Sequence, residues 1–215
     1  TAMATGQKTY SGAIGVDVER QPVENLVEAA EATGRATGVV SSVQFAHATP
    51  AGFVAHSEGR GSYEEIARQM IHDSAADVIM GAGHPDYDDA AQAIEGDRDY
   101  QYVGGEESWA SVNAGTAGGD ADADGDPDPW VLVDDLAEFE ALTAGDAPDR
   151  VLGVPRVRST LQQRRPGDAE ADAYAVPFNE GVPDLATMAG GALNVLDNDP
   201  DGLFLMIEGG AVDWA

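Results

Sequence analysis

The chain has 215 residues, enough for one α/β domain with a sizeable core, and its 43% hydrophobic content excludes intrinsic disorder. Its formal net charge of −28, from 39 acidic and 11 basic residues, excludes the basic surface that nucleic-acid binding needs and is typical of a halophilic protein, whose self-repulsion is screened near molar salt. The lack of cysteine excludes disulfides and thiolate metal sites, and no apolar run approaches the roughly 18 residues of a membrane span.

Helices and short strands alternate through the first part of the chain. Residues 1–6 read as a helix end closed by Gly6. Apolar spacing and turn residues then predict a helix over 23–33, a strand over 37–45, a helix over 62–75 with Ser62 and Glu65 as a capping box, and a strand over 77–83. This alternation predicts a three-layer αβα sandwich, doubly wound around a mostly parallel sheet.

The pattern is weaker between about 85 and 180. Residues 120–128 are densely acidic and imitate the start of an EF-hand loop, but position twelve is Val131 instead of a glutamate, so we expect a solvated surface loop. A strand over 130–133, a helix over 134–144 and a strand over 150–154 follow. Residues 156–174 read as a loop, and Pro183-Asp184 opens a helix that leads into the last strand.

Five consecutive apolar residues, 203–207, predict a strand buried on both faces. Glu208 follows directly, Gly209-Gly210 allow a bend, and Asp213 supplies a second carboxylate. Asp213 lies five positions after Glu208, a separation that would span about 16 Å if extended, so only a turn brings both acids to one site. Ligands bind outside the carboxyl ends of parallel strands, so this stretch is either a hard-metal site or a core strand followed by a solvated acidic loop, and these residues alone do not decide between the two.

A second group of candidate residues follows the 37–45 strand. Thr49-Pro50 predict a helix start with Thr49 as N-cap, and a helix end at Gly59. The Thr49 hydroxyl either only caps this helix or also ligates a hard cation such as Mg²⁺. His47 is either a structural histidine or a residue beside a metal. Arg60 is either a surface arginine or a bidentate phosphate ligand.

Three stretches together resemble the alkaline phosphatase family. They are His47-Ala48-Thr49-Pro50-Ala51 with Arg60 eleven residues after Thr49, the run from Glu208 to Trp214, and the opening from Thr1 to Asp17. The resemblance covers residues 1–215 in the family's order, as part of a single α/β domain with a variable region at about 85–180. The pairing of His47 with Trp214 resembles the His/Trp subgroup of the family.

The resemblance implies a role for each matching residue. Thr49 and Glu208 match two magnesium ligands, Asp213 matches a zinc ligand, and Arg60 matches the arginine that grips the phosphate. His47 and Trp214 match positions beside the magnesium site that tune it. The implied cofactors are two zinc ions and one magnesium ion, and the implied reaction is phosphomonoester hydrolysis through a phosphoserine.

Other family residues lie outside the sequence. The nucleophilic serine is expected a few residues before Thr1 and a metal-binding histidine just after Ala215, so the chain reads as the central portion of a longer enzyme. The family also implies a homodimer in the periplasm or outside the cell, with neither nucleic acid nor membrane as partner. Two alternatives remain open: a phosphodiesterase or sulfatase of the same superfamily, and a non-catalytic acidic cation-binding protein or inactive fragment.

Overall fold

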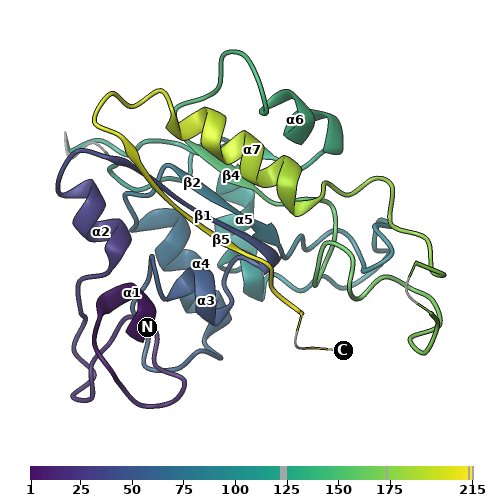
Figure 1. Cartoon of the computed structure of the whole chain (residues 1–215), viewed down its shortest axis with the longest axis horizontal. Coiled ribbons are helices and arrows are strands. Elements are labelled where there is room, and N and C mark those ends of the chain that lie inside the picture. Colours follow the sequence, from purple (N-terminus) through teal and green to yellow (C-terminus); the bar gives the residue numbers. More distant parts are fainter. Residues whose placement is uncertain (122–124, 173, 213, 215) are drawn as a thin grey trace.

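The computed structural model describes residues 1–121, 125–172, 174–212 and 214. Within them the centre is a five-stranded sheet (Figure 1). Its strands are β1 (Ala36–Gln44), β2 (Val78–Ala82), β3 (Val131–Val133), β4 (Val151–Gly153) and β5 (Leu203–Glu208). Their spatial order is β3-β4-β2-β1-β5, and each neighbouring pair is parallel.

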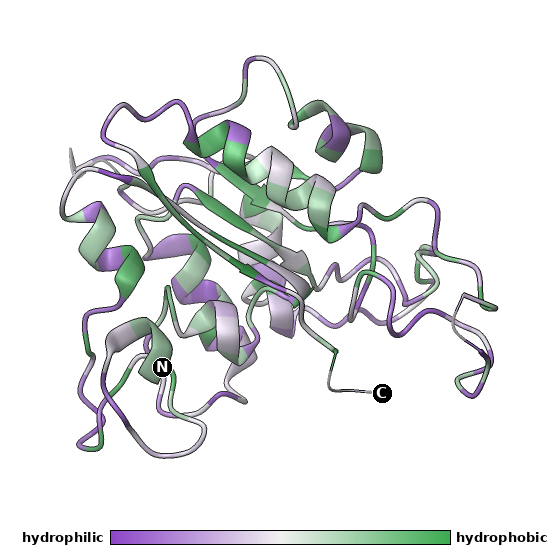
Figure 2. Cartoon of the chain, in the orientation of Figure 1, coloured by the Kyte–Doolittle hydropathy of each residue, from purple (hydrophilic) through white to green (hydrophobic). Residues whose placement is uncertain are grey.

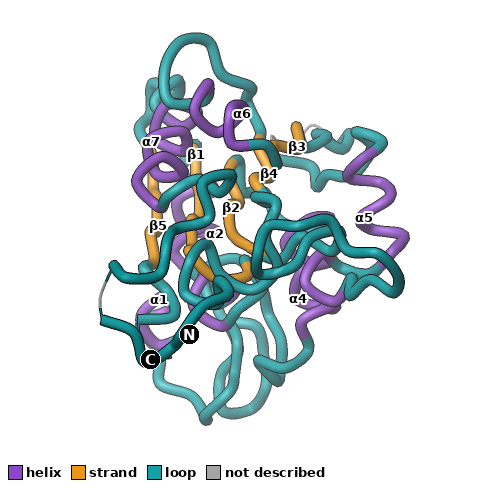
Figure 3. Tube along the Cα trace, turned by 90° about the vertical axis from the view of Figure 1, so that its right-hand side faces the viewer, coloured by secondary structure: helices purple, strands orange, loops and turns teal. Residues whose placement is uncertain are grey.

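Helices cover both faces of the sheet, which confirms the predicted αβα architecture (Figures 1 and 3). One layer holds α6 (Leu136–Ala141) and α7 (Leu185–Leu196). The other holds α2 (Leu26–Glu31), α3 (Ala48–Ala51), α4 (Tyr63–His72) and α5 (Glu106–Asn113), with the short α1 (Ala2–Thr5) and η1 (Gln101–Val103) nearby. None of the helices in this described part of the chain has the length and apolar character needed to cross a bilayer.

Successive strand residues point to opposite layers, so the chain forms two apolar clusters with the sheet between them. Val39 and Ile79 pack on the α2–α5 side, whereas Val40 and Met80 pack on the α6–α7 side. Figure 2 shows hydrophobic colouring along the central strands and mixed colouring on the helices that flank them. The central strands are therefore continuous apolar runs, as expected for a parallel sheet covered on both faces.

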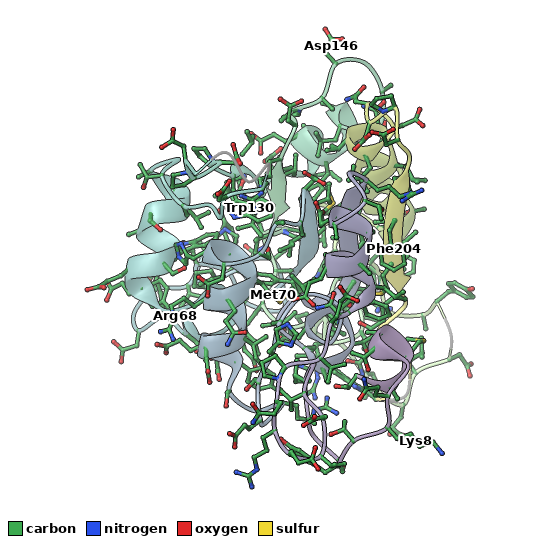
Figure 4. All side chains as sticks on the ribbon, turned by 90° about the vertical axis from the view of Figure 1, so that its left-hand side faces the viewer. Lys8, Arg68, Met70, Trp130, Asp146 and Phe204 are labelled. Carbon is green, nitrogen blue, oxygen red and sulfur yellow. The ribbon has the colours of Figure 1, made fainter. Side chains whose placement is uncertain are left out.

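Helix α4 shows how one amphipathic segment serves this packing. Met70 is fully buried against the sheet, and Arg68, two residues earlier, is exposed on the outer side of the helix (Figure 4). Ser62 is the N-cap residue, but its side chain makes no capping hydrogen bond. The predicted capping box between Ser62 and Glu65 is therefore wrong, although the helix is where the sequence placed it.

Two helix starts and one strand environment differ from the predictions. The helix expected over 23–33 begins only at Leu26, because Asn25 caps it and forms a capping box with Glu28. Helix α3 has His47 as its N-cap residue and Gly52 as its C-cap, so Thr49 is not the cap and the helix does not reach Gly59. Strand β5 is an edge strand in the described sheet rather than a strand buried on both faces, and its Ile207 is 47% exposed.

The region between 85 and 129 contains more regular structure than the sequence suggested, namely η1 and α5. The acidic loop over 120–128 lies partly outside the described residues, at 122–124. On its described part, the Asp128 carboxylate accepts a hydrogen bond from the backbone N–H of Ala121 at 2.8 Å. The prediction of a solvated surface loop over 120–128 stays a prediction.

The amino ends of the strands carry a buried arginine. Arg150 donates hydrogen bonds to the carbonyls of Ala76, Gly119, Asp128 and Ser74 at 2.6–2.9 Å and lies over the Trp130 ring at 3.9 Å. Five donors on one planar group suit this task of tying several loops together. Arg150 thus has a structural role at the amino ends of the strands, which lie opposite the carboxyl ends where ligands bind.

A pH-dependent contribution to stability arises beside this arginine. Burial raises the pKa of Glu31 to about 7, and the negative charge of Asp77 adds to the rise. The hydrogen bond that Glu31 accepts from Thr37 lowers the pKa and offsets part of this effect. The folded chain therefore holds a proton that the unfolded chain has lost, so stability falls as pH rises from about 4.5 to about 7. Glu31→Gln should remove this fall and gain about 1 kcal/mol at pH 8 after allowance for solvent screening.

Urea unfolding at pH 5 and pH 8 measures this difference. The exposed Glu24→Gln is the matched control and should leave the pH dependence as it is in the parent chain. An equal effect of Glu31→Gln at both pH values would contradict the assignment.

Candidate functional site

The carboxyl ends of β1 and β5 bring together the two segments that the sequence analysis singled out. These strands are parallel neighbours, and Ser41 of β1 lies opposite Glu208, the last residue of β5. Helix α3 follows β1 after only three residues and contacts both strands. His47 and Thr49 therefore lie at the same edge of the sheet as Glu208, although about 160 residues separate them in sequence.

Glu208 is held by a buried serine. The Ser41 hydroxyl donates a hydrogen bond to Glu208 Oε2 at 2.6 Å, and Ser41 Oγ accepts the backbone N–H of Val43 at 3.2 Å. No partner is recorded for Glu208 Oε1 within the described residues. One carboxylate oxygen is thus committed and the other is free for a ligand.

Thr49 is the second residue of α3 and is half-buried. Its hydroxyl caps nothing and has no hydrogen bond recorded among the residues described. Because the first backbone N–H groups of a helix need no intrahelical acceptor, Pro50 fits directly after Thr49 without strain. The Thr49 hydroxyl is therefore an uncommitted oxygen donor at this edge of the sheet.

His47 is enclosed by aromatic rings. Its imidazole stacks on Tyr63 with centroids 5.3 Å apart and an interplanar angle of 16°, and it contacts Tyr102 at 6.2 Å and Trp214 at 5.5 Å. Within the described residues no hydrogen bond is recorded to its ring nitrogens. The orientation of the imidazole is therefore set by stacking, and Trp214 is brought to it from the far end of the chain.

Two opposite charges act on this imidazole. Burial lowers the pKa of His47, the positive charge of Arg60 lowers it further, and the negative charge of Glu208 opposes both. Arg60 and Glu208 therefore both lie within electrostatic reach of one ring. The Arg60 side chain is exposed, its backbone N–H donates to Gly12 at 2.7 Å, and in the described part of the chain no ion pair is recorded for its guanidinium.

After β5 the chain passes tightly over β1. The Ser42 hydroxyl donates to the carbonyl of Gly210 at 3.0 Å, and a Cβ on Gly210 would come within 2.7 Å of the Val43 side chain. The glycines do allow a turn, as the sequence suggested, but the close approach makes Gly210 in particular necessary. Asp213, the predicted zinc ligand, lies outside the described residues.

Gly210→Ala should destabilise the chain by about 1–3 kcal/mol, because the β-branched Val43 is buried and cannot move aside. Gly209→Ala, at a position where an added Cβ meets nothing, is the matched control and should cost much less. Thermal unfolding of the two variants measures the difference. Equal losses would mean that the approach to Val43 is not what requires glycine.

The free oxygens fit one kind of metal better than another. The Thr49 hydroxyl and Glu208 Oε1 are hard donors of the type that Mg²⁺ takes together with water. In the described ranges no group of three or more histidine, aspartate or glutamate side chains is poised to hold an ion, so these two residues supply only part of a coordination shell. The other three histidines are bonded elsewhere: His56 to Glu28, His72 to Ser108 and His84 to Asp134.

Three residues of the site were not predicted. Ser41, Tyr63 and Tyr102 touch Glu208 or His47, yet none belongs to the motifs that drew attention. Strand register could have indicated Ser41, since it precedes His47 by six residues on the same strand and turn. Nothing local indicates Tyr102, because its place depends on the packing of η1 against α4.

The comparisons with known proteins agree on one family. The sequence pattern that defines alkaline phosphatases matches residues 1–215. Alkaline phosphatase H of Pseudomonas aeruginosa (strain UCBPP-PA14) is 32% identical over 228 residues, which cover 99% of this chain and 46% of that protein. Alkaline phosphatase of Escherichia coli (strain K12) is 29% identical over 242 residues, which cover 99% of this chain and 47% of that protein.

Solved structures give the same result for the fold. A cold-active alkaline phosphatase from a psychrophilic Shewanella sp. has a TM-score of 0.67 and 28% identity, covering 100% of this chain and 42% of that one. Alkaline phosphatase from the Antarctic bacterium TAB5 has a TM-score of 0.65 and 24% identity, covering 99% of this chain and 50% of that one, and this likeness concerns the fold alone. The chain spans about half the length of the curated relatives it matches.

Proposed function

Because the chain belongs to the alkaline phosphatase family, we propose that the whole protein hydrolyses phosphomonoesters through a phosphoserine intermediate at a site of two zinc ions and one magnesium ion. The observation that carries the proposal is that the β1–β5 pairing brings Glu208 to the edge of the sheet where His47 and Thr49 lie, with the charge of Arg60 also acting on the His47 imidazole. A cation site and an anion-binding guanidinium within reach of one another are what phosphoryl transfer requires.

Each candidate residue has one task in this proposal. Arg60 binds two oxygens of the phosphoryl group and stabilises the charge that develops on them. Thr49 and Glu208 hold the magnesium ion through oxygen, and Asp213 contributes to a zinc site. His47 and Trp214 pack beside the magnesium site and tune it. Bound zinc in such a site supplies activation of the attacking hydroxyl and stabilisation of the leaving oxygen.

The first residue of the sequence packs against the end of α3, the helix that carries Thr49, since Thr1 N lies 3.1 Å from where a Cβ on Gly52 would sit. We further propose that residues 1–215 are part of one α/β domain, and that the enzyme is a homodimer in the periplasm or outside the cell.

Substrate preference tests the reaction. The full-length protein, loaded with zinc and magnesium, is expected to turn over p-nitrophenyl phosphate much faster than bis-p-nitrophenyl phosphate or p-nitrophenyl sulfate. A preference for the diester or the sulfate would assign the protein to another branch of the superfamily. Lack of turnover of all three after metal loading would favour a non-catalytic cation-binding protein.

Salt adaptation is the remaining part of the proposal. With 39 acidic and 11 basic residues, the folded chain repels itself more than the expanded one, and about 2 M KCl shortens the screening length to a few ångströms. The melting temperature should therefore rise between 0.1 M and 2 M KCl, by about 2–4 °C for each kcal/mol of repulsion removed. Differential scanning calorimetry measures it, and a melting temperature independent of KCl would contradict the halophile interpretation.

A further inference from the structure

Ser41 is a buried hydroxyl with two defined partners. It lies in β1, is 0% exposed, and faces Glu208 across the β1–β5 pairing. The β1–β2 pairing is irregular between Val40 and Gln44, and Ser41 Oγ takes up the N–H of Val43 in that stretch. A hydroxyl has one proton and two lone pairs, so accepting from Val43 leaves its proton for another group.

That proton goes to Glu208. The distance from Ser41 Oγ to Glu208 Oε2 is 2.6 Å, the length of a charge-assisted O–H···O⁻ hydrogen bond. An ionised carboxylate only accepts, which fixes the direction of the bond. Oε2 is thereby engaged and Oε1 is left as the oxygen available to a cation.

The number of available oxygens matters for which cation binds. Mg²⁺ requires near-ideal octahedral geometry and takes carboxylates through one oxygen, whereas Ca²⁺ takes six to eight oxygens and accepts a carboxylate through both. The Ser41 bond uses one lone pair of Oε2 and fixes the orientation of the carboxylate, which favours binding through Oε1 alone, the mode that Mg²⁺ takes, over the two-oxygen mode that Ca²⁺ accepts. We propose that Ser41 is a positioning residue that keeps Glu208 a one-oxygen ligand and so makes the site prefer Mg²⁺ over Ca²⁺. The inference rests on the magnesium site proposed above.

The neighbouring serine has no such role. Ser42 points to the other face of β1, and its hydroxyl donates to the carbonyl of Gly210 at 3.0 Å. The two adjacent serines lie on one strand and each donates a hydrogen bond to the segment at the end of β5, but only Ser41 contacts Glu208. This makes Ser42→Ala a matched control for Ser41→Ala.

The experiment measures binding rather than turnover. The full-length protein is stripped of divalent cations with a chelator, reloaded with zinc, and titrated with MgCl₂ and with CaCl₂ in a calorimeter. The heat that Glu208→Gln abolishes is the heat of this site. Ser41→Ala is expected to weaken Mg²⁺ binding about 10-fold, the lower end of what loss of an outer-shell partner costs. Ca²⁺ binding should weaken by no more than about twofold or strengthen, so the Mg²⁺/Ca²⁺ preference falls at least about fivefold.

Two further variants make the result decisive. Ser41→Thr keeps the hydroxyl and should restore the preference, and Ser42→Ala should leave it at the parent value. If Ser41→Ala weakens Mg²⁺ binding and Ca²⁺ binding equally, Ser41 only supports the irregular stretch of β1. If it changes the affinity for neither cation, Ser41 has no role at the site. Either result overturns the proposal. If Glu208→Gln abolishes no Mg²⁺ heat, the magnesium site itself is wrong, and the role of Ser41 falls with it.

Discussion

Arg60→Ala in the full-length, metal-loaded enzyme should lower kcat/KM for p-nitrophenyl phosphate by about 10²–10³-fold, the effect of removing one strong donor to a developing oxyanion. The physical reason is that the guanidinium is exposed and has no recorded ion pair among the described residues, so its donors are free for phosphate. The kcat should fall and the inhibition constant of inorganic phosphate should rise, since the contact exists both in the bound and in the reacting state. Steady-state kinetics with phosphate as inhibitor measures both.

Arg68→Ala is the control for charge. Arg68 is also exposed and lies on the outer side of α4, away from the sheet edge that carries Glu208 (Figure 4). The two substitutions change the net charge equally, so a long-range electrostatic effect would appear in both. Similar kinetics of the two variants, or an Arg60→Ala enzyme with parent kinetics, would remove the proposed role of Arg60.

Glu208→Gln should weaken magnesium binding by at least about 10–100-fold and leave most of the zinc bound. The hydrogen bond from Ser41 makes this substitution more severe than the loss of charge alone. Ser41 will bind the one remaining oxygen of the amide, which turns the NH₂ group, a donor without a free lone pair, toward the cation. Metal analysis by mass spectrometry after dialysis against micromolar magnesium measures the loss.

Glu95→Gln serves as the control for Glu208→Gln, because Glu95 is an exposed glutamate in the loop after β2. It should retain the parent magnesium content. A Glu208→Gln protein with unaltered magnesium would contradict the ligand assignment, whereas loss of zinc and magnesium together would point to collapse of the whole site.

Local sequence signals were sufficient for much of the fold. The segments predicted as strands at 37–45, 77–83 and 203–207 became β1, β2 and β5, and the helix expected to open at Pro183-Asp184 is α7, for which Asp184 is the N-cap. A run of apolar residues does not show how many other strands will pair with it in the sheet. Leu203–Ile207 look like a central strand, but only β1 pairs with this strand in the described sheet.

The start of α3 shows a different limit. Thr49-Pro50 favour a helix start, but Pro is tolerated throughout the first turn, where no backbone N–H is needed, so it cannot fix which residue is the cap. His47 takes that position by its extended backbone, without a side-chain hydrogen bond. The error has a functional meaning, since a Thr49 hydroxyl that does not cap is free to bind something else.

The surroundings of the site were beyond any local pattern. Stacking of Tyr63 on His47 and the approach of Tyr102 depend on how α4 and η1 pack, and the contact with Trp214 depends on the path of the chain after β5. Motifs identify the residues that touch ligands. They do not identify the supporting residues such as Tyr63 and Tyr102, because which side chains pack around a ligand-binding residue depends on the three-dimensional fold.

The hydrogen bond between Ser41 and Glu208 joins residues 167 positions apart. Closing so large a loop is among the entropically most demanding steps on the way to the native state, and it gains nothing until the intervening sheet exists to support it. During refolding, helical signal should therefore return well before this edge of the sheet assembles. Recovery of cation binding would consequently report completion of folding, and a partly unfolded chain would lose it while most of its secondary structure persists.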